Sequence, residues 1–105
     1  MSVYVIAHLT IHDRDRYNRY QDGFMEVFEK FDGTMLSVDE EPMVLDGEFT
    51  ATRSVLIEFP SKGQAMAWMT SPEYQEIAKH RVAASTANSI LVQGLDPEAA
   101  LPGTA

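Results

Sequence analysis

Two side chains suited to proton transfer stand near the ends of predicted strands. His8 lies late in an alternating segment over residues 3–10, and Glu58 lies near the end of the segment 54–59. The alternation places both side chains on the same, more polar face of a predicted sheet. A histidine next to a carboxylate can relay a proton, because the carboxylate tunes the histidine pKa. A hydrogen-bonded polar pair in a subunit interface is the alternative interpretation, and the sequence leaves both open.

Five other side chains have the chemistry to hold a small organic ligand. Arg81 is predicted on the inner face of the last helix, where its guanidinium group can bind a ligand carboxylate or tie down an acidic residue of a hairpin. Gln93, assigned to the polar sheet face, can orient a ligand or bond across an interface. Tyr17, Tyr20 and Trp68 fall at buried helical positions, where aromatic residues either line a pocket or fill the core.

No arrangement of residues indicates a metal or cofactor site. The chain has no cysteine, which excludes thiolate ligands and disulfides. Its three histidines, His8, His12 and His80, show no metal-binding spacing such as H-x-x-x-H. A role for His80 as a haem ligand would rest on fold analogy alone. We therefore expect neither a metal nor an organic cofactor.

Two serines in the segment "FPSKGQAMAWMTSPEYQ" have complete structural roles. Ser61 precedes Gln64 by three residues, which is the spacing of a capping box. Ser71 directly precedes Pro72, the residue best suited to a first helical position. Neither serine lies in a G-x-S-x-G motif. The segment therefore predicts two successive helices and no catalytic serine.

The composition indicates an acidic globular protein. The chain has 105 residues, 45% of them hydrophobic, and a formal net charge of -8. This charge, and the absence of a Lys/Arg stripe, argue against nucleic acid and anionic membrane surfaces as partners. No apolar run is long enough to cross a membrane, and the start of the sequence lacks a signal-peptide pattern. We expect a cytoplasmic protein whose partners are small molecules and copies of itself.

Periodicity and turn signals predict the element order β-α-β-β-α-β. This order is ferredoxin-like, an α+β fold in which helices cover one face of a four-stranded antiparallel sheet. We assign residues 1–95 to a single domain of this kind and residues 96–105 to a flexible C-terminal tail.

Local signals mark the ends of several predicted elements. Asp13 is placed to cap the first helix. The second strand is expected to be interrupted by Glu40–Pro42, to resume at residues 43–45, and to turn at Asp46–Gly47 into the third strand. The sequence thus predicts a hairpin between the second and third strands.

The two faces of the predicted sheet differ in polarity. The apolar face suits the helices, and we assign to it Val3, Val5, Ala7, Leu9, Val55, Ile57, Phe59, Ile90 and Val92. The mixed face receives Tyr4, Ile6, His8, Ser54, Leu56, Glu58, Ser89, Leu91 and Gln93. Covering each large apolar side chain of the mixed face can contribute about 1.5–3 kcal/mol before association costs. We therefore expect a second subunit there, forming a dimeric α/β barrel whose interior is the predicted pocket.

Three stretches together resemble the domain-of-unknown-function 1330 family. They are "YVIAHLTIHDRDRYNRY", "EFPSKGQAMAWMTSPEYQEIAKHR" and "ILVQGL". The family pattern has a strand ending E-F-P-S, a Trp about nine residues on, then S-P-E-Y-Q and an Arg. Asp13, Tyr17 and Tyr20 match its D-x-x-x-Y-x-x-Y segment. The segment "FTATRS" departs from the pattern, since it replaces a hairpin segment that contains Trp and Pro.

The resemblance implies the fold of the dimeric α/β-barrel proteins and brings no established activity. That fold is shared by cofactor-free monooxygenases, lactone isomerases and haem-handling enzymes. Three hypotheses follow. The first is a homodimer that binds a small, partly apolar organic molecule in the barrel interior. The second is a cofactor-independent isomerase or monooxygenase with His8 and Glu58 as its acid–base pair. The third is a structural dimerisation module.

Overall fold

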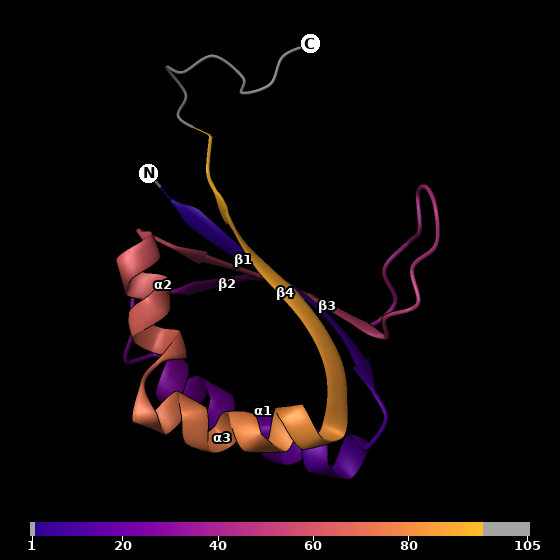
Figure 1. Cartoon of the computed structure of the whole chain (residues 1–105), viewed down its shortest axis with the longest axis horizontal. Coiled ribbons are helices and arrows are strands. Elements are labelled where there is room, and N and C mark those ends of the chain that lie inside the picture. The colour runs from indigo at the N-terminus through magenta and orange to yellow at the C-terminus, as the bar shows by residue number, and fades with distance from the viewer. Residues whose placement is uncertain (1, 96–105) are drawn as a thin grey trace.

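An antiparallel sheet carries three helices on one of its faces (Figure 1). The computed structural model describes residues 2–95. Its elements are, in chain order, β1 (Val3–Ile11), α1 (Arg14–Phe28), β2 (Thr34–Asp39), β3 (Arg53–Phe59), α2 (Lys62–Met69), α3 (Pro72–Ala84) and β4 (Ser85–Gln93). The strands lie in the order β2-β3-β1-β4. The predicted ferredoxin-like fold is confirmed, and the predicted tail at 96–105 lies outside the described residues.

Helix α1 begins at the predicted cap and buries one side. The Asp13 carboxylate accepts a hydrogen bond from the backbone N–H of Arg16 at 3.1 Å, which satisfies one of the free amides at the helix start. The buried residues of this helix recur at helical spacing and are Tyr17, Tyr20, Phe24, Val27 and Phe28. This stripe faces the sheet and forms much of the core.

The two serine caps divide the second helical region into α2 and α3, as predicted. Ser61 Oγ accepts from the backbone N–H of Gln64 at 3.2 Å. Ser71 Oγ accepts from the N–H of Tyr74 at 3.2 Å and donates to the carbonyl of Trp68 at 2.8 Å. Ser71 therefore satisfies the end of one helix and the start of the next. The chain changes direction between the two helices, so the buried side chains of α2 and α3 follow different helix axes (Figure 1).

Strand β4 presents a different set of side chains to the helices from the one predicted. Directly opposite residues of an antiparallel pair share a sheet face. Val3 lies opposite Gln93 and Val5 lies opposite Leu91, so these β4 residues are on the helix side of the sheet. Ile90, assigned to the helix side, is on the other face and 60% exposed. The two predicted faces of this strand are therefore interchanged.

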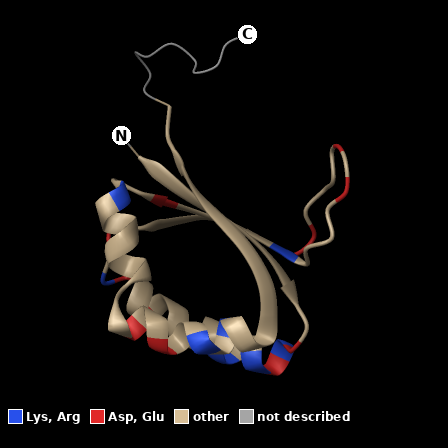
Figure 2. Cartoon of the chain, viewed as in Figure 1, with Lys and Arg blue, Asp and Glu red and all other residues tan. Residues whose placement is uncertain are grey.

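The segment between β2 and β3 is a projecting loop over residues 40–52 (Figure 1). The predicted resumption of the second strand is wrong, because Met43 and Leu45 lie outside the sheet and are 83% and 89% exposed. Gly47 has φ 75°, the left-handed region that glycine adopts without strain. The charged residues of this loop are all acidic, whereas acidic and basic residues are interspersed on the helices (Figure 2).

The core between sheet and helices is rich in aromatic rings around Trp68. Its ring centroid lies 4.4 Å from that of Tyr74 and 5.5 Å from that of Phe59, on which it stacks. Phe24 and Phe28 meet the indole edge-on at 6.0 and 5.7 Å. Such contacts add to the burial of apolar area. One side of this cluster forms part of a cavity wall.

Candidate functional site

A cavity of about 280 Å³ lies between the helix side of the sheet and the helices. Every strand and helix contributes to its lining. Much of the wall is apolar and includes Val5, Phe24, Met35, Val55, Ile57 and Trp68. Its polar groups include Tyr17, Tyr20, Tyr74, Arg53 and Arg81. An apolar enclosure with a few convergent polar groups is the usual form of a small-molecule site.

Four of the predicted ligand-binding residues meet in this cavity. Tyr17 and Tyr20 reach it from α1, Trp68 from α2 and Arg81 from α3. Among the described residues Arg81 makes no ion pair, so it does not tie down an acidic residue of the loop. The cavity lies on the opposite side of the sheet from the predicted pocket, which would need a second chain to enclose it.

The prediction that His8 and Glu58 lie close together is wrong within one chain. The register of β1 and β3 places His8 opposite Ser54 and Glu58 opposite Tyr4. Four residues of extended strand therefore separate the two side chains, a distance of roughly 13 Å. Glu58 accepts a hydrogen bond from the Tyr4 hydroxyl at 3.3 Å. Neither side chain lines the cavity.

His8 and Gln93 lie in different surroundings, on opposite faces of the sheet. The imidazole of His8 meets the ring of Phe49, in the projecting loop, edge-on at 4.8 Å. Gln93 shares the helix side of the sheet with Val3, so the prediction that it lies on the face of His8 is wrong. It is exposed and does not line the cavity. The acid–base candidates and Gln93 are therefore not parts of one site in this chain.

The tyrosine hydroxyls of the cavity act as neutral hydrogen-bonding groups. Tyr20 and Tyr74 share a buried hydrogen bond of 3.0 Å between their hydroxyl oxygens. Burial raises the pKa of Tyr20 well above its ordinary value of 10.0, and the neighbouring Tyr74 raises it further. Burial also raises the pKa of Tyr17, although Arg53 and Arg81 act in the opposite direction. The phenols of Tyr17 and Tyr20 therefore stay protonated near neutral pH, and neither supplies a phenolate base.

Arg53 is a component of the site that the sequence interpretation missed. It begins β3 opposite Leu9, which puts its side chain in phase with Val55 and Ile57 on the helix side of the sheet. Its guanidinium carbon lies 5.3 Å from the centroid of the Tyr17 ring, in a cation–π contact. Extending the alternation of the third strand two residues before Val55 would have found this arginine.

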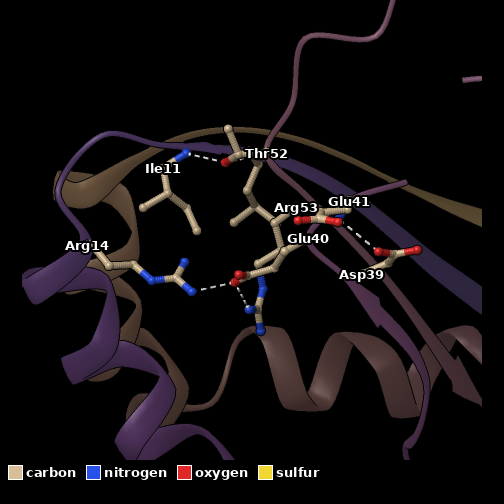
Figure 3. A network of polar contacts seen from close by, with 8 residues as sticks. Ile11, Arg14, Asp39, Glu40, Glu41, Thr52 and Arg53 are labelled. Carbon is tan, nitrogen blue, oxygen red and sulfur yellow. Dashed lines mark hydrogen bonds and ion pairs between the residues drawn. The ribbon is translucent and has the colours of Figure 1, made fainter. Parts of the chain in front are cut away.

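Glu40 joins two arginines at the start of the projecting loop (Figure 3). Its Oε1 accepts from Arg14 at 2.6 Å and from Arg53 at 2.8 Å. The hydrogen bond from Arg14, followed by that from Arg53, lowers the pKa of the Glu40 carboxyl below its ordinary value of 4.5. The two ion pairs thus anchor the loop to α1 through Arg14 and to β3 through Arg53.

We expect a titration of the Glu40 carboxyl, followed by carbon NMR, to give a pKa below 4.5. A depressed pKa in the folded state stabilises the protein above the unfolded value of about 4.5, and this contribution is lost as pH falls through the folded value. Since the Glu40 side chain is 41% exposed, the contribution should stay within about 0.2–1 kcal/mol. Arg14→Gln should raise the Glu40 pKa.

Lys79→Gln is the matched control for this titration. Lys79 pairs with Glu76 at 2.9 Å on α3 and lowers the pKa of that carboxyl. Its removal should move the Glu76 pKa and leave that of Glu40 unchanged. A Glu40 pKa that is insensitive to Arg14→Gln would show that the anchoring network does not persist in solution.

Neither a metal-binding cluster nor a membrane-spanning helix is found among residues 2–95. Across residues 2–95, no group of three or more His, Cys, Asp or Glu side chains is arranged to hold a metal ion. None of the helices in the same part of the chain is long and apolar enough to cross a membrane.

The family of the chain follows from a match over nearly all of the described residues. A family described as a domain of unknown function, DUF1330, matches residues 2–95. The chain belongs to the DUF1330 family. The predicted resemblance is therefore confirmed. No curated protein matches this DUF1330 chain.

Solved structures share the fold of the DUF1330 chain at low sequence identity. A protein of unknown function from Rhodopseudomonas palustris is 20% identical, with a TM-score of 0.78 over 91% of this chain and 84% of that one. A dimeric ferredoxin-like protein of unknown function from Jannaschia sp. CCS1 is 12% identical, with a TM-score of 0.70 over 90% and 100% of the two chains.

An oxygenase is also among these structures. SnoaB of Streptomyces nogalater, described as a cofactor-independent oxygenase, is 14% identical to this chain, with a TM-score of 0.62 over 92% of this chain and 96% of that one. At such identities the similarity concerns the fold, and function has to be argued from the site.

Proposed function

We propose that the protein is a cytoplasmic homodimer that binds a small, partly apolar organic molecule in the cavity between the sheet and the helices. The cavity itself carries this proposal. Its volume of about 280 Å³ lies just below the usual range of ligand pockets, about 300 to 1,000 Å³, and suits a small ligand. Its walls are apolar, and its arginine and tyrosine groups offer a limited number of directional contacts.

The homodimer is supported by the sheet face that the helices leave uncovered. Ile90 on this face is 60% exposed, while Ile6, Leu56 and Val92 beside it are half-buried. An exposed apolar surface of this kind is characteristic of an interface. Ferredoxin-like proteins from Jannaschia, Bacteroides fragilis and Thermobifida fusca are described as dimeric. The second copy in our proposal covers this face and leaves the cavity on the other side accessible.

Catalysis without a cofactor is the second candidate. It is favoured by two proteins that share this fold, the oxygenase SnoaB and a protein from Nitrosomonas europaea described as a putative antibiotic biosynthesis monooxygenase. The cavity supports binding better, because its lining contains no histidine and no carboxylate to serve as a base. Within one chain, His8 and Glu58 are too far apart to work as a pair. A dimerisation module without a ligand is the third candidate, and it gives the cavity no role.

Native mass spectrometry of protein isolated gently from cells tests the proposal. We expect a dimer that carries an additional small mass. Ala7 lines the cavity from β1, so Ala7→Leu should fill part of it and lower the occupancy of that mass by about tenfold or more, since a single misplaced group in a pocket costs 1–3 kcal/mol.

Ala67→Leu provides the matched control, because it makes the same change at an exposed position on α2 outside the cavity. This variant should keep both the dimer and the bound mass. A monomeric protein would refute the proposed assembly. A bound mass that survives Ala7→Leu undiminished would place the ligand elsewhere, and a bare dimer would favour the dimerisation module.

A further inference from the structure

Two residues that line the cavity each carry a covered N–H group without a described acceptor. The side chain of Arg53 is 11% exposed, and its Nη1 donates to Glu40 at 2.8 Å. Its Nε is fully covered and has no hydrogen-bond partner among the described residues. The indole Nε1 of Trp68, which also lines the cavity, is likewise covered and without a described partner. Buried polar groups are nearly always paired, so these two donors show that the protein leaves part of the polar chemistry around the cavity unsatisfied.

The missing partners are all acceptors. A guanidinium group has five N–H donors and no acceptor, and an indole N–H can only donate. Arg81 adds a second guanidinium group to the lining and makes no ion pair among the described residues. Glu40 is the one carboxylate that touches Arg53 in this part of the chain, and it engages Nη1 from the loop side. Since two guanidinium groups line the cavity, a ligand that fits it should bring oxygen acceptors.

The charge of the cavity also favours a ligand with negatively charged oxygen atoms. Both Arg53 and Arg81 act to lower the pKa of Tyr17, so both guanidinium groups create a positive potential within the cavity. This occurs in a chain whose formal net charge is -8. The positive groups are thus concentrated where the surrounding wall is apolar and where screening by water is weak.

We propose that the ligand is an apolar monocarboxylate whose carboxylate is bound by Arg53, with Arg81 as the second cation and the apolar body against Trp68. This inference rests on the proposed function of the cavity. Arg53 would keep Nη1 on Glu40 and use Nη2 for the ligand, because a charge-assisted N–H donor suits a carboxylate. Because the walls are apolar and few further donors converge, a carboxylate fits better than a phosphate.

Binding of benzoate and of its neutral analogue benzamide, measured by isothermal titration calorimetry, tests the inference on the full chain. Benzoate should bind about 10–100-fold more tightly than benzamide, since a hydrogen bond to a charged group contributes that much. Arg53→Gln should remove this preference by weakening benzoate binding much more than benzamide binding. Arg53→Lys keeps the charge without the guanidinium group and should give an intermediate preference, so it serves as the second variant if Arg53→Gln does not fold.

Arg14→Gln is the control, because it removes the other, exposed partner of Glu40 and should preserve the preference. Equal binding of benzoate and benzamide by the unmodified protein, or an unchanged preference in Arg53→Gln, would overturn the carboxylate inference and leave the binding function intact. Tighter binding of phenyl phosphate than of benzoate would replace the carboxylate by a phosphate ester. Binding of neither aromatic probe would overturn the inference together with the proposed use of the cavity.

Discussion

Replacing Trp68 with alanine should destabilise the fold by about 3–5 kcal/mol, as for other fully buried aromatic side chains. The indole is 3% exposed and joins α2 to the sheet through Phe59 and to α3 through Tyr74. Its loss would enlarge a cavity that already exists beside it. Since domains of this size are stable by only about 5–15 kcal/mol, the variant should unfold at much lower urea concentration.

The change in the urea midpoint, followed by circular dichroism at a fixed protein concentration, measures this effect. A fixed concentration is required because dissociation of a dimer contributes to its apparent stability. Met66→Ala is the control on the same helix, since Met66 is 42% exposed, and it should change the stability by no more than about 0.5 kcal/mol. Equal midpoints for the two variants would contradict the central position given to Trp68.

Replacing Gly33 with alanine should destabilise the protein by about 1–3 kcal/mol, the usual cost of overpacking. A Cβ atom at this position would lie 2.5 Å from Cζ of Phe28 and 2.8 Å from Cε1 of Phe59. Both rings are buried, so neither can move aside freely. Gly33 is therefore needed for space between α1 and β2, where the chain passes close to two rings.

Gly63→Ala makes the same change where there is room. The nearest atom to its added Cβ would be Ser61 Oγ at 3.8 Å, and the position lies in the first turn of α2. Because alanine favours helix, this variant should be more stable than the unmodified protein by up to about 1 kcal/mol. Thermal unfolding of the two variants should move Tm in opposite directions. A loss of stability in both would mean that helix α2 is packed differently.

Features determined by local sequence were predictable. Asp13, Ser61 and Ser71 accept the hydrogen bonds expected of helix caps, because capping depends on residues within three positions of each other. The order of strands and helices also follows from local periodicity and turn signals. The split between α2 and α3 belongs to the same class of features.

Features determined by register were not predictable from one strand at a time. Ile90, Leu91 and Val92 are three consecutive apolar residues, so their pattern is compatible with either face. Pairing with β1 decides the question and puts Leu91 toward the helices. A shift by one residue exchanges the two faces of a strand completely. This accounts for the error in the placement of Gln93.

The candidate site was predicted only in part: its helix residues were placed correctly, whereas its strand residues depend on how the strands pair. Tyr17, Tyr20, Trp68 and Arg81 belong to helices, where the buried side is evident from the sequence, and all four line the cavity. His8 and Glu58 both stand near the ends of their strands, and because β1 and β3 are antiparallel these ends lie far apart.

The burial of Arg53 follows from its contacts in the folded chain and could not be predicted from its residue type. It directly follows the projecting loop, and the predicted third strand begins one residue later, at Ser54. A charged residue beside such a boundary is ordinarily solvated. Only the packing of Tyr17 and Glu40 around the guanidinium group shows that it is buried.

The placement of Trp68 has an optical consequence. It is the only tryptophan in the chain, it forms part of the cavity wall, and its ring lies 4.4 Å from that of Tyr74. Light absorbed by the tyrosines of the cavity can pass to this one indole, whose emission colour depends on the polarity around it. The intrinsic fluorescence of the unmodified protein should therefore report cavity occupancy directly. A library of small acids could be screened by that signal without any label.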